Sequence, residues 1–395
     1  MHRITERWRK ADPAYKAFLL AVFFLGINSG VQTTLFNNYL NDVFGMSAHA
    51  RGFLEFPREF PGFMVIFVTG LLAALPVRQW AVITGVLSAA GTAGLGFLSP
   101  SMAAMIVWML AWSTGAHLYM TVESVMGLRF GREGGHGRRL GQISGVTNLA
   151  AIAAAGLVWL LARAAGPGLY RWSFGIGAAA ALAAAWLFSR VEDGEEPRQK
   201  GARRFVFRRS YSLYYLLNVL TGARKQIFLT FAPWVLVTVY GVNPATMAAL
   251  ALIAAALGVF FRQVFGEAVD RFGERKMFMA DAAILLVICA GFAFSTLKPV
   301  LYGLFILESL MFAMRIARTT YLNRIAEHKA DIAPTVSLGV TLDHAVSMTI
   351  PALGGLLWAA FGYRSVFIAA SLLSVAGFLA ALAVDERPGP SAARA

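Results

Sequence analysis

Apolar runs of roughly 20 residues recur along the whole of this 395-residue chain. A run of that length crosses the hydrocarbon core of a bilayer as one helix, which satisfies its own backbone hydrogen bonds without water. Only 14% of the residues are charged, whereas a soluble chain carries about 25%. The sequence therefore predicts an all-α polytopic membrane protein.

Twelve transmembrane helices are expected. Their predicted positions are residues 15–40, 51–75, 80–98, 102–128, 140–162, 171–189, 211–239, 244–266, 276–296, 299–323, 333–360 and 362–384. The first run is too long for a signal-peptide core, so we expect it to be retained. Residues 190–210 are charged, contain Pro197 and Gly201, and separate six spans from six. We therefore expect an N-terminal half at 1–189, a linker at 190–210 and a C-terminal half at 211–395.

The net charge of +14 would fit a nucleic-acid partner, but its placement argues for a membrane. Most of the 35 Lys and Arg residues lie at the chain ends and in alternate loops. The opposite loops carry only Arg51, Arg163, Arg171, Lys298 and Arg364. Basic loops stay in the cytoplasm. We therefore expect both termini and the linker inside the cell, in the inner or plasma membrane, with lipid and no nucleic acid as partner.

The two halves repeat weakly at an offset of 196 residues. The matched glycines are Gly26 with Gly222, Gly45 with Gly241, Gly62 with Gly258, and Gly70 with Gly266. A repeated half is a common plan of secondary transporters.

The loop at 266–276 reads G-x-x-x-D-R-x-G-x-R-K. Its defining residues are Gly266, Asp270, Arg271, Gly273, Arg275 and Lys276. We expect close helix approach at Gly266 and a tight reversal at Gly273. The basic residues mark a cytoplasmic membrane edge.

This loop resembles the signature between the second and third helices of each half of major facilitator superfamily transporters. The resemblance implies two six-helix pseudo-repeat halves, with spans 1, 4, 7 and 10 around a central cavity. We expect Asp270 to pair with basic groups or a helix N-terminus at the inner surface and to hold the halves together there, and the resemblance implies that this contact favours the outward-facing state. The first half departs from the pattern, because Ala74 stands where the aspartate would be. Span 4 also lacks a buried arginine and span 5 lacks a Gly-Pro motif. The resemblance therefore implies neither the coupling ion nor the direction of transport.

Ionisable groups inside a membrane cost roughly 2.5–3.5 kcal/mol each at a helix centre and usually face a cavity or one another. Span 7 contains Arg224 and Lys225, and span 10 contains Glu308, Arg315 and Arg318 on one face. We interpret all five as candidate substrate contacts, with Arg224 and Arg315 first. The alternative is structural ion pairing of these basic groups with Glu308 and Asp343.

Polar residues in the first half are weaker candidates. Asn28 and Gln32 lie one turn apart in span 1 and suit hydrogen bonds to a ligand or across helices. Tyr119 shares a face of span 4 with Glu123. Tyr119 is a candidate substrate contact or a packing residue. Glu123 is a candidate proton site or a partner of Arg129.

Three further acidic residues and one histidine are candidates for proton coupling. Glu55 and Glu59 flank Arg58 at the start of span 2, where Glu55 and Arg58 are spaced to pair. Asp343 and His344 are adjacent in span 11 and could relay a proton.

These features favour a secondary active transporter of a small anionic or zwitterionic organic solute, working by alternating access and possibly coupled to protons. The alternatives are a multidrug or lipophile exporter, and a non-transporting receptor or scaffold on the same fold. The six histidines are scattered, and we find no catalytic, metal or phosphate-loop motif. We therefore expect neither an enzyme nor a cofactor, and we expect a monomer.

Overall fold

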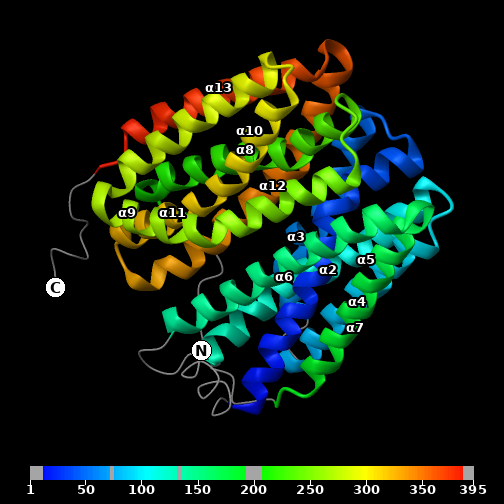
Figure 1. Cartoon of the computed structure of the whole chain (residues 1–395). Helices are drawn as coiled ribbons and strands as arrows, with labels where there is room; N and C mark the ends of the chain where they lie inside the picture. Colours follow the sequence, from blue (N-terminus) through cyan, green and yellow to red (C-terminus); the bar gives the residue numbers. More distant parts are fainter. Residues whose placement is uncertain (1–11, 72–74, 131–135, 193–206, 386–395) are drawn as a thin grey trace. The chain divides into compact units, whose positions relative to one another are not determined.

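The computed structural model describes residues 12–71, 75–130, 136–192 and 207–385 (Figure 1). All regular structure in these residues is helical. The helices of the first half are α2 (Pro13–Phe44), α3 (Ala48–Leu71), α4 (Val77–Phe97), α5 (Met102–Arg129), α6 (His136–Ala164) and α7 (Leu169–Ser189). Those of the second half are α8 (Ser212–Thr238), α9 (Pro244–Phe294), α10 (Lys298–Met311), α11 (Arg315–Ile325), α12 (Lys329–Phe361) and α13 (Tyr363–Leu382).

These helices overlap every predicted span, and the all-α membrane fold is confirmed. Seven of the described helices are long and apolar enough to cross a membrane. The total of twelve crossings stays a prediction, partly because α9 extends over two predicted spans. Gly273 interrupts α9 with φ 79° and ψ 162°, a conformation open mainly to glycine. Gly273 therefore divides α9 into two helices, at the position where the sequence predicted a reversal.

Residue contacts divide the chain into two compact units. The first contains the described residues up to Phe44, Met64–Pro197 and Asn243–Ala255. The second contains Gly45–Phe63, Arg198–Val242 and Ala256–Ala395. The first part of α3 thus packs with helices that follow the linker. The division into halves at 189 and 211 stays a prediction. The contact units differ from it in two segments: residues 45–63 belong to the second unit and residues 243–255 to the first.

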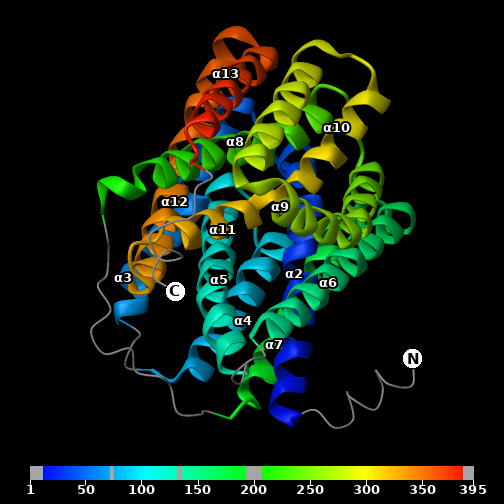
Figure 2. The same ribbon diagram turned by 90° about the vertical axis from the view of Figure 1, so that its left-hand side faces the viewer.

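The first unit is built on α2, α4, α5, α6 and α7 (Figure 2). α4 packs against α5 and α7, while α2 packs against α6 and α7. Its apolar core includes Phe18, Phe188 and Val122, each almost fully buried. A Cβ added to Gly91 would collide with the backbone of Trp112, which shows how closely α4 and α5 approach.

The second unit is arranged around α8, which packs against α12 and α13 (Figure 1). Phe228, Phe231 and Trp234 of α8 are almost completely buried. Helix α10 ends in a short 3-10 turn at Phe312–Met314 before α11 begins. This irregular turn lies inside the tenth predicted span.

Matched glycine turns confirm the internal repeat. Gly45 (φ 53°) and Gly241 (φ 62°) follow α2 and α8, and Gly166 (φ 51°) and Gly362 (φ 79°) precede α7 and α13. Each pair is separated by the 196-residue offset of the predicted repeat. The sequence comparison had identified only the first pair.

Candidate functional site

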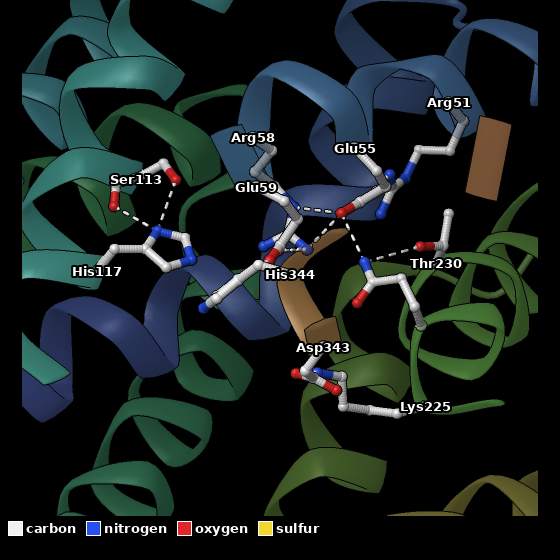
Figure 3. A network of polar contacts seen from close by, with 11 residues as sticks. Arg51, Glu55, Arg58, Glu59, Ser113, His117, Lys225, Thr230, Asp343 and His344 are labelled. Atoms are coloured by element: carbon white, nitrogen blue, oxygen red, sulfur yellow. Dashed lines mark hydrogen bonds and ion pairs between the residues drawn. The ribbon is translucent and has the colours of Figure 1, made fainter. Parts of the chain in front are cut away.

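Glu55 lies at the centre of a buried polar network on the first part of α3 (Figure 3). Arg51 Nη1 donates to Glu55 Oε1 at 2.5 Å, and Arg58 Nε donates to Glu55 Oε2 at 2.7 Å. Gln226 of α8 donates to Glu55 Oε2 at 2.7 Å. The predicted Glu55–Arg58 pair is therefore present. Glu55 thus accepts hydrogen bonds from three donors, two of them guanidinium groups, and such charge-assisted bonds are strong.

Glu59 continues this network toward α12. Arg58 forms an ion pair with Glu59 Oε1 at 2.6 Å, and His344 Nδ1 lies 3.2 Å from Glu59 Oε2. Glu59 and His344 are both buried. Figure 3 shows His344 turned toward Glu59. The two neighbouring candidates of span 11 therefore have different partners.

Asp343 pairs with Lys225 of α8. A Cβ on Gly222 would lie 2.6 Å from Asp343 Oδ1, so only glycine leaves room for this carboxylate beside α8. The two side chains keep 18% and 24% of their surface exposed, whereas Arg51 and Glu55 keep 3% and 0%. The Lys225–Asp343 pair is the more accessible of the two.

Arg224, the residue before Lys225, faces a different neighbour. Its Nη1 is 2.6 Å from Asp281 Oδ2 on α9. Both residues line a pocket between α8, α9 and α13. Glu308 of α10 is buried and interacts electrostatically with both. The sequence analysis named Glu308 and Asp343 as the ion-pair partners that Arg224 would have in a structural role, whereas the structure pairs it with Asp281.

The remaining candidates of span 10 are less fully defined. Arg318 donates to Asn218 Oδ1 of α8 at 3.0 Å. The side chain of Arg315 lies outside the described part of the structure.

Asn28 and Gln32 hydrogen-bond across helices of the first unit. Asn28 Nδ2 donates to Thr92 Oγ1 at 2.8 Å and to Gly177 O at 3.0 Å, and Gln32 Nε2 donates to Thr92 Oγ1 at 3.0 Å. These bonds join α2 to α4 and α7. The sequence left open whether Asn28 and Gln32 bind a ligand or hydrogen-bond between helices, and the observed bonds are of the second kind.

Tyr119 and Glu123 lie together on α5. The Tyr119 hydroxyl is 3.4 Å from Glu123 Oε1, at the long end of the hydrogen-bonding range. The expected partner of Glu123, Arg129, donates to the backbone oxygen of Glu192 at 2.6 Å. His117 bonds Ser113 of its own helix turn (Figure 3).

The signature loop is partly exposed. Within its own unit, a Cβ on Gly266 would meet no atom within 4 Å, so the expected close helix approach is absent there. Asp270 is exposed and forms no hydrogen bond with the described residues. Arg271, Arg275 and Lys276 are exposed or half-buried. Glu274 anchors the loop, since its Oε2 is 3.2 Å from Arg324 Nε of α11.

Sequence reasoning missed Asp281, Gln226 and Asn218, which hold Arg224, Glu55 and Arg318 respectively. Asp281 had a usable signal, because it is a carboxylate inside the predicted span 276–296. The two amides had none, since uncharged polar residues are common in membrane helices.

A bundle of long apolar helices with internal repeats and buried ion pairs is the architecture of a membrane transporter. The family model of the Major Facilitator Superfamily matches residues 18–333 and 214–395. The chain belongs to this superfamily. It is 31% identical over 150 residues to the MFS-type transporter ppzB of Metarhizium rileyi, a match that covers 36% of this chain and only 29% of that protein.

Solved structures share the fold at low sequence identity. The nucleoside transporter NupG is similar with a TM-score of 0.74 and 14% identity, over 95% of this chain and 100% of that chain. A bacterial homologue of the human lysosomal transporter Spinster has a TM-score of 0.73 and 15% identity, over 94% and 97% of the two chains. The D-xylose–proton symporter has a TM-score of 0.69 and 17% identity, over 94% and 96%.

Proposed function

We propose that this protein is a secondary active transporter that moves a small organic anion or zwitterion by alternating access. Lys225 and Asp343 are the pair that meets the substrate. The observation that carries this assignment is their partial exposure within membrane helices, in contrast to the buried Arg51–Glu55 pair.

The charges of this pair favour a zwitterion. A solute carboxylate or phosphate would replace Asp343 at the Lys225 ammonium, and a solute amine would take the freed Asp343. Each intramembrane charge is costly alone, so the exchange keeps every charge compensated. An apolar drug offers neither charge, and this argues against the exporter alternative.

Proton coupling is part of the proposal. One relative in fold is described as a proton symporter. The unit contains several buried carboxylates, among them Glu59 beside His344. The positive loops support a cell membrane with both termini in the cytoplasm. The working unit is a monomer in lipid.

Uptake into proteoliposomes of pooled metabolites, read by mass spectrometry with and without a pH gradient, tests this proposal. We expect accumulation of acidic or zwitterionic compounds. The double variant Lys225→Gln/Asp343→Asn keeps the site neutral, so it should fold and insert yet lose uptake. Loss of one charge-assisted contact, worth about 1.5–3 kcal/mol, corresponds to roughly tenfold or more in KM.

The matched control is Lys298→Gln, at the exposed start of α10, which should transport normally. Normal uptake by the double variant would remove Lys225 and Asp343 from the substrate site. Uptake restricted to neutral lipophiles or cations would contradict the substrate class.

A further inference from the structure

We propose that Glu308 is the proton-binding carboxylate of this transporter, and that Arg224 changes partner when Glu308 loses its proton. The coupling role rests on the proposed transport function. The proton site itself does not, because it is defined by charges and contacts within one unit.

The described charges around Arg224 favour a bound proton. Arg224 is 7% exposed and Glu308 is 5% exposed. Arg224 Nη1 is bound to Asp281 Oδ2 at 2.6 Å, and Glu308 lies in electrostatic contact with both. Among the described groups here, two carboxylates share one guanidinium. A buried ion without a counter-charge costs several kcal/mol, and protonation of one carboxylate removes that cost.

Glu308, rather than Asp281, is the group that binds the proton. Asp281 already accepts a charge-assisted bond from Arg224, so its charge has a counter-charge. Glu308 has no hydrogen bond or ion pair with the described residues, and its Oε1 is buried without a partner. A carboxyl in that position is held as the neutral acid.

Two buried atoms without hydrogen-bond partners indicate how Arg224 would respond if Glu308 became charged. Arg224 Nε is a buried donor without a partner, and Glu308 Oε1 is a buried acceptor without one. Buried polar atoms are nearly always hydrogen-bonded, so a donor and an acceptor left over in one cluster need an explanation. Proton loss turns Glu308 into an anion that attracts the guanidinium. A bond from Arg224 Nε to Glu308 Oε1 then forms, and on protonation it breaks.

This exchange links the proton to helix packing. Arg224 is on α8, Asp281 on α9 and Glu308 on α10, so a shift of Arg224 from Asp281 toward Glu308 draws α10 to α8. The 3-10 turn at Phe312–Met314 follows Glu308 by one helical turn. Short 3-10 segments within helices mark places where a helix bends.

A proton fits this site better than a metal cation. Among the side chains that the structure describes, the charged and titratable groups around Glu308 are Arg224 of α8 and Asp281 and Cys289 of α9. Arg224 repels a sodium ion, and the two orphaned carboxylate oxygens, on Glu308 and Asp281, fall short of the six or so oxygens that hard cations take. Protonation needs one oxygen.

Infrared difference spectroscopy of the purified protein in lipid nanodiscs tests the proton site without a substrate. We expect the C=O stretching band of a protonated carboxylic acid to fall as the pH rises between about 5 and 9, the interval over which buried carboxyls titrate. Glu308→Gln should lose this band. Glu267→Gln, at an exposed position of α9, should keep it. A band that persists in Glu308→Gln would overturn the proposal, and so would the absence of any such band in the parent protein.

Transport assays test the coupling. Glu308→Gln mimics the protonated acid, so it should lose the accumulation driven by a pH gradient and retain exchange of labelled for unlabelled substrate. Accumulation that still follows the gradient in this variant contradicts the coupling role. If the infrared band is lost but no compound is transported, the proposed function fails and the proton site stands.

Discussion

At the scale of single residues, Glu55 and Glu59 show how one turn of helix separates two kinds of carboxylate. Glu55 is fully buried and accepts bonds from Arg51, Arg58 and Gln226. Glu59 shares Arg58 and faces His344 of α12. Glu55 is therefore held by two arginines and an amide, whereas Glu59 has one arginine and an imidazole as its partners.

Glu55→Gln should destabilise the fold. The change removes the negative charge between two buried or half-buried arginines, and breaking a buried ion pair costs about 3–5 kcal/mol. Thermal unfolding of the purified protein in detergent measures the loss. Glu267→Gln, which removes an exposed carboxylate, is the control and should unfold like the parent. Equal midpoints for the two variants would show that the arginines do not depend on Glu55.

The sequence predicted pairs of charged residues within one helix but not between helices. Glu55 and Arg58 were predictable because both lie on one helix at a fixed spacing. The Asp281 partner of Arg224 was not, because helical periodicity gives the direction of a side chain around its own axis and not the neighbour that it meets. The roles of these residues in transport stay predictions.

At the scale of helices, α8 uses two adjacent residues to contact two different neighbours. Successive side chains on a helix point about 100° apart. Arg224 accordingly meets α9 and Lys225 meets α12. One helix thus links the proposed proton site to the proposed substrate pair, and a rotation of α8 would affect both.

Gly222→Ala should disturb the α8–α12 contact. The new Cβ would lie 2.6 Å from Asp343 Oδ1, closer than real Cβ atoms come, so Asp343 must move away from Lys225. We expect a raised KM, by roughly tenfold for a loss of about 1.4 kcal/mol, read from uptake in proteoliposomes. Gly258→Ala is the matched control, because its Cβ would meet nothing within 4 Å. Identical uptake by both variants would show that Asp343 can move away from the new Cβ without losing its function.

Helix positions were largely predictable, since long apolar runs leave few alternatives to a helix. The exceptions have local causes. The break predicted between residues 266 and 276 is narrower than expected, because one glycine with a positive φ, Gly273, is enough to redirect the chain. The 3-10 turn at Phe312–Met314 leaves no mark in an apolar sequence.

At the scale of the whole molecule, the 196-residue internal repeat is preserved in glycine turns with a positive φ rather than in matching side chains. The pair Gly166 and Gly362 recurs at the same offset as the pair Gly45 and Gly241, each with a positive φ. The side chains between these turns have diverged, and the clustered ion pairs described above belong to the second unit. The function that we propose accordingly places substrate and proton on that unit.

The topology follows from charge and is directly testable. Gln199 falls in the basic linker predicted to be cytoplasmic. A cysteine at this position, in a background where Cys289 is replaced, should resist a membrane-impermeant maleimide in intact cells and react after lysis. Labelling of intact cells would reverse the orientation and the assignment of inner and outer loops.

The network on α3 has a consequence for biosynthesis. Gln226 and His344 are made 171 and 285 residues after the glutamates that they contact. On the predicted topology, in which residues 51–75 form a span, α3 enters the bilayer with four charged side chains, and a charge at a helix centre costs roughly 2.5–3.5 kcal/mol on insertion scales. Arg51, Glu55, Arg58 and Glu59 cancel one another along a single helix, with spacings of four, three and one. On that topology we expect the segment to enter with no net charge and to gain its contacts with Gln226 and His344 only when α8 and α12 have been made.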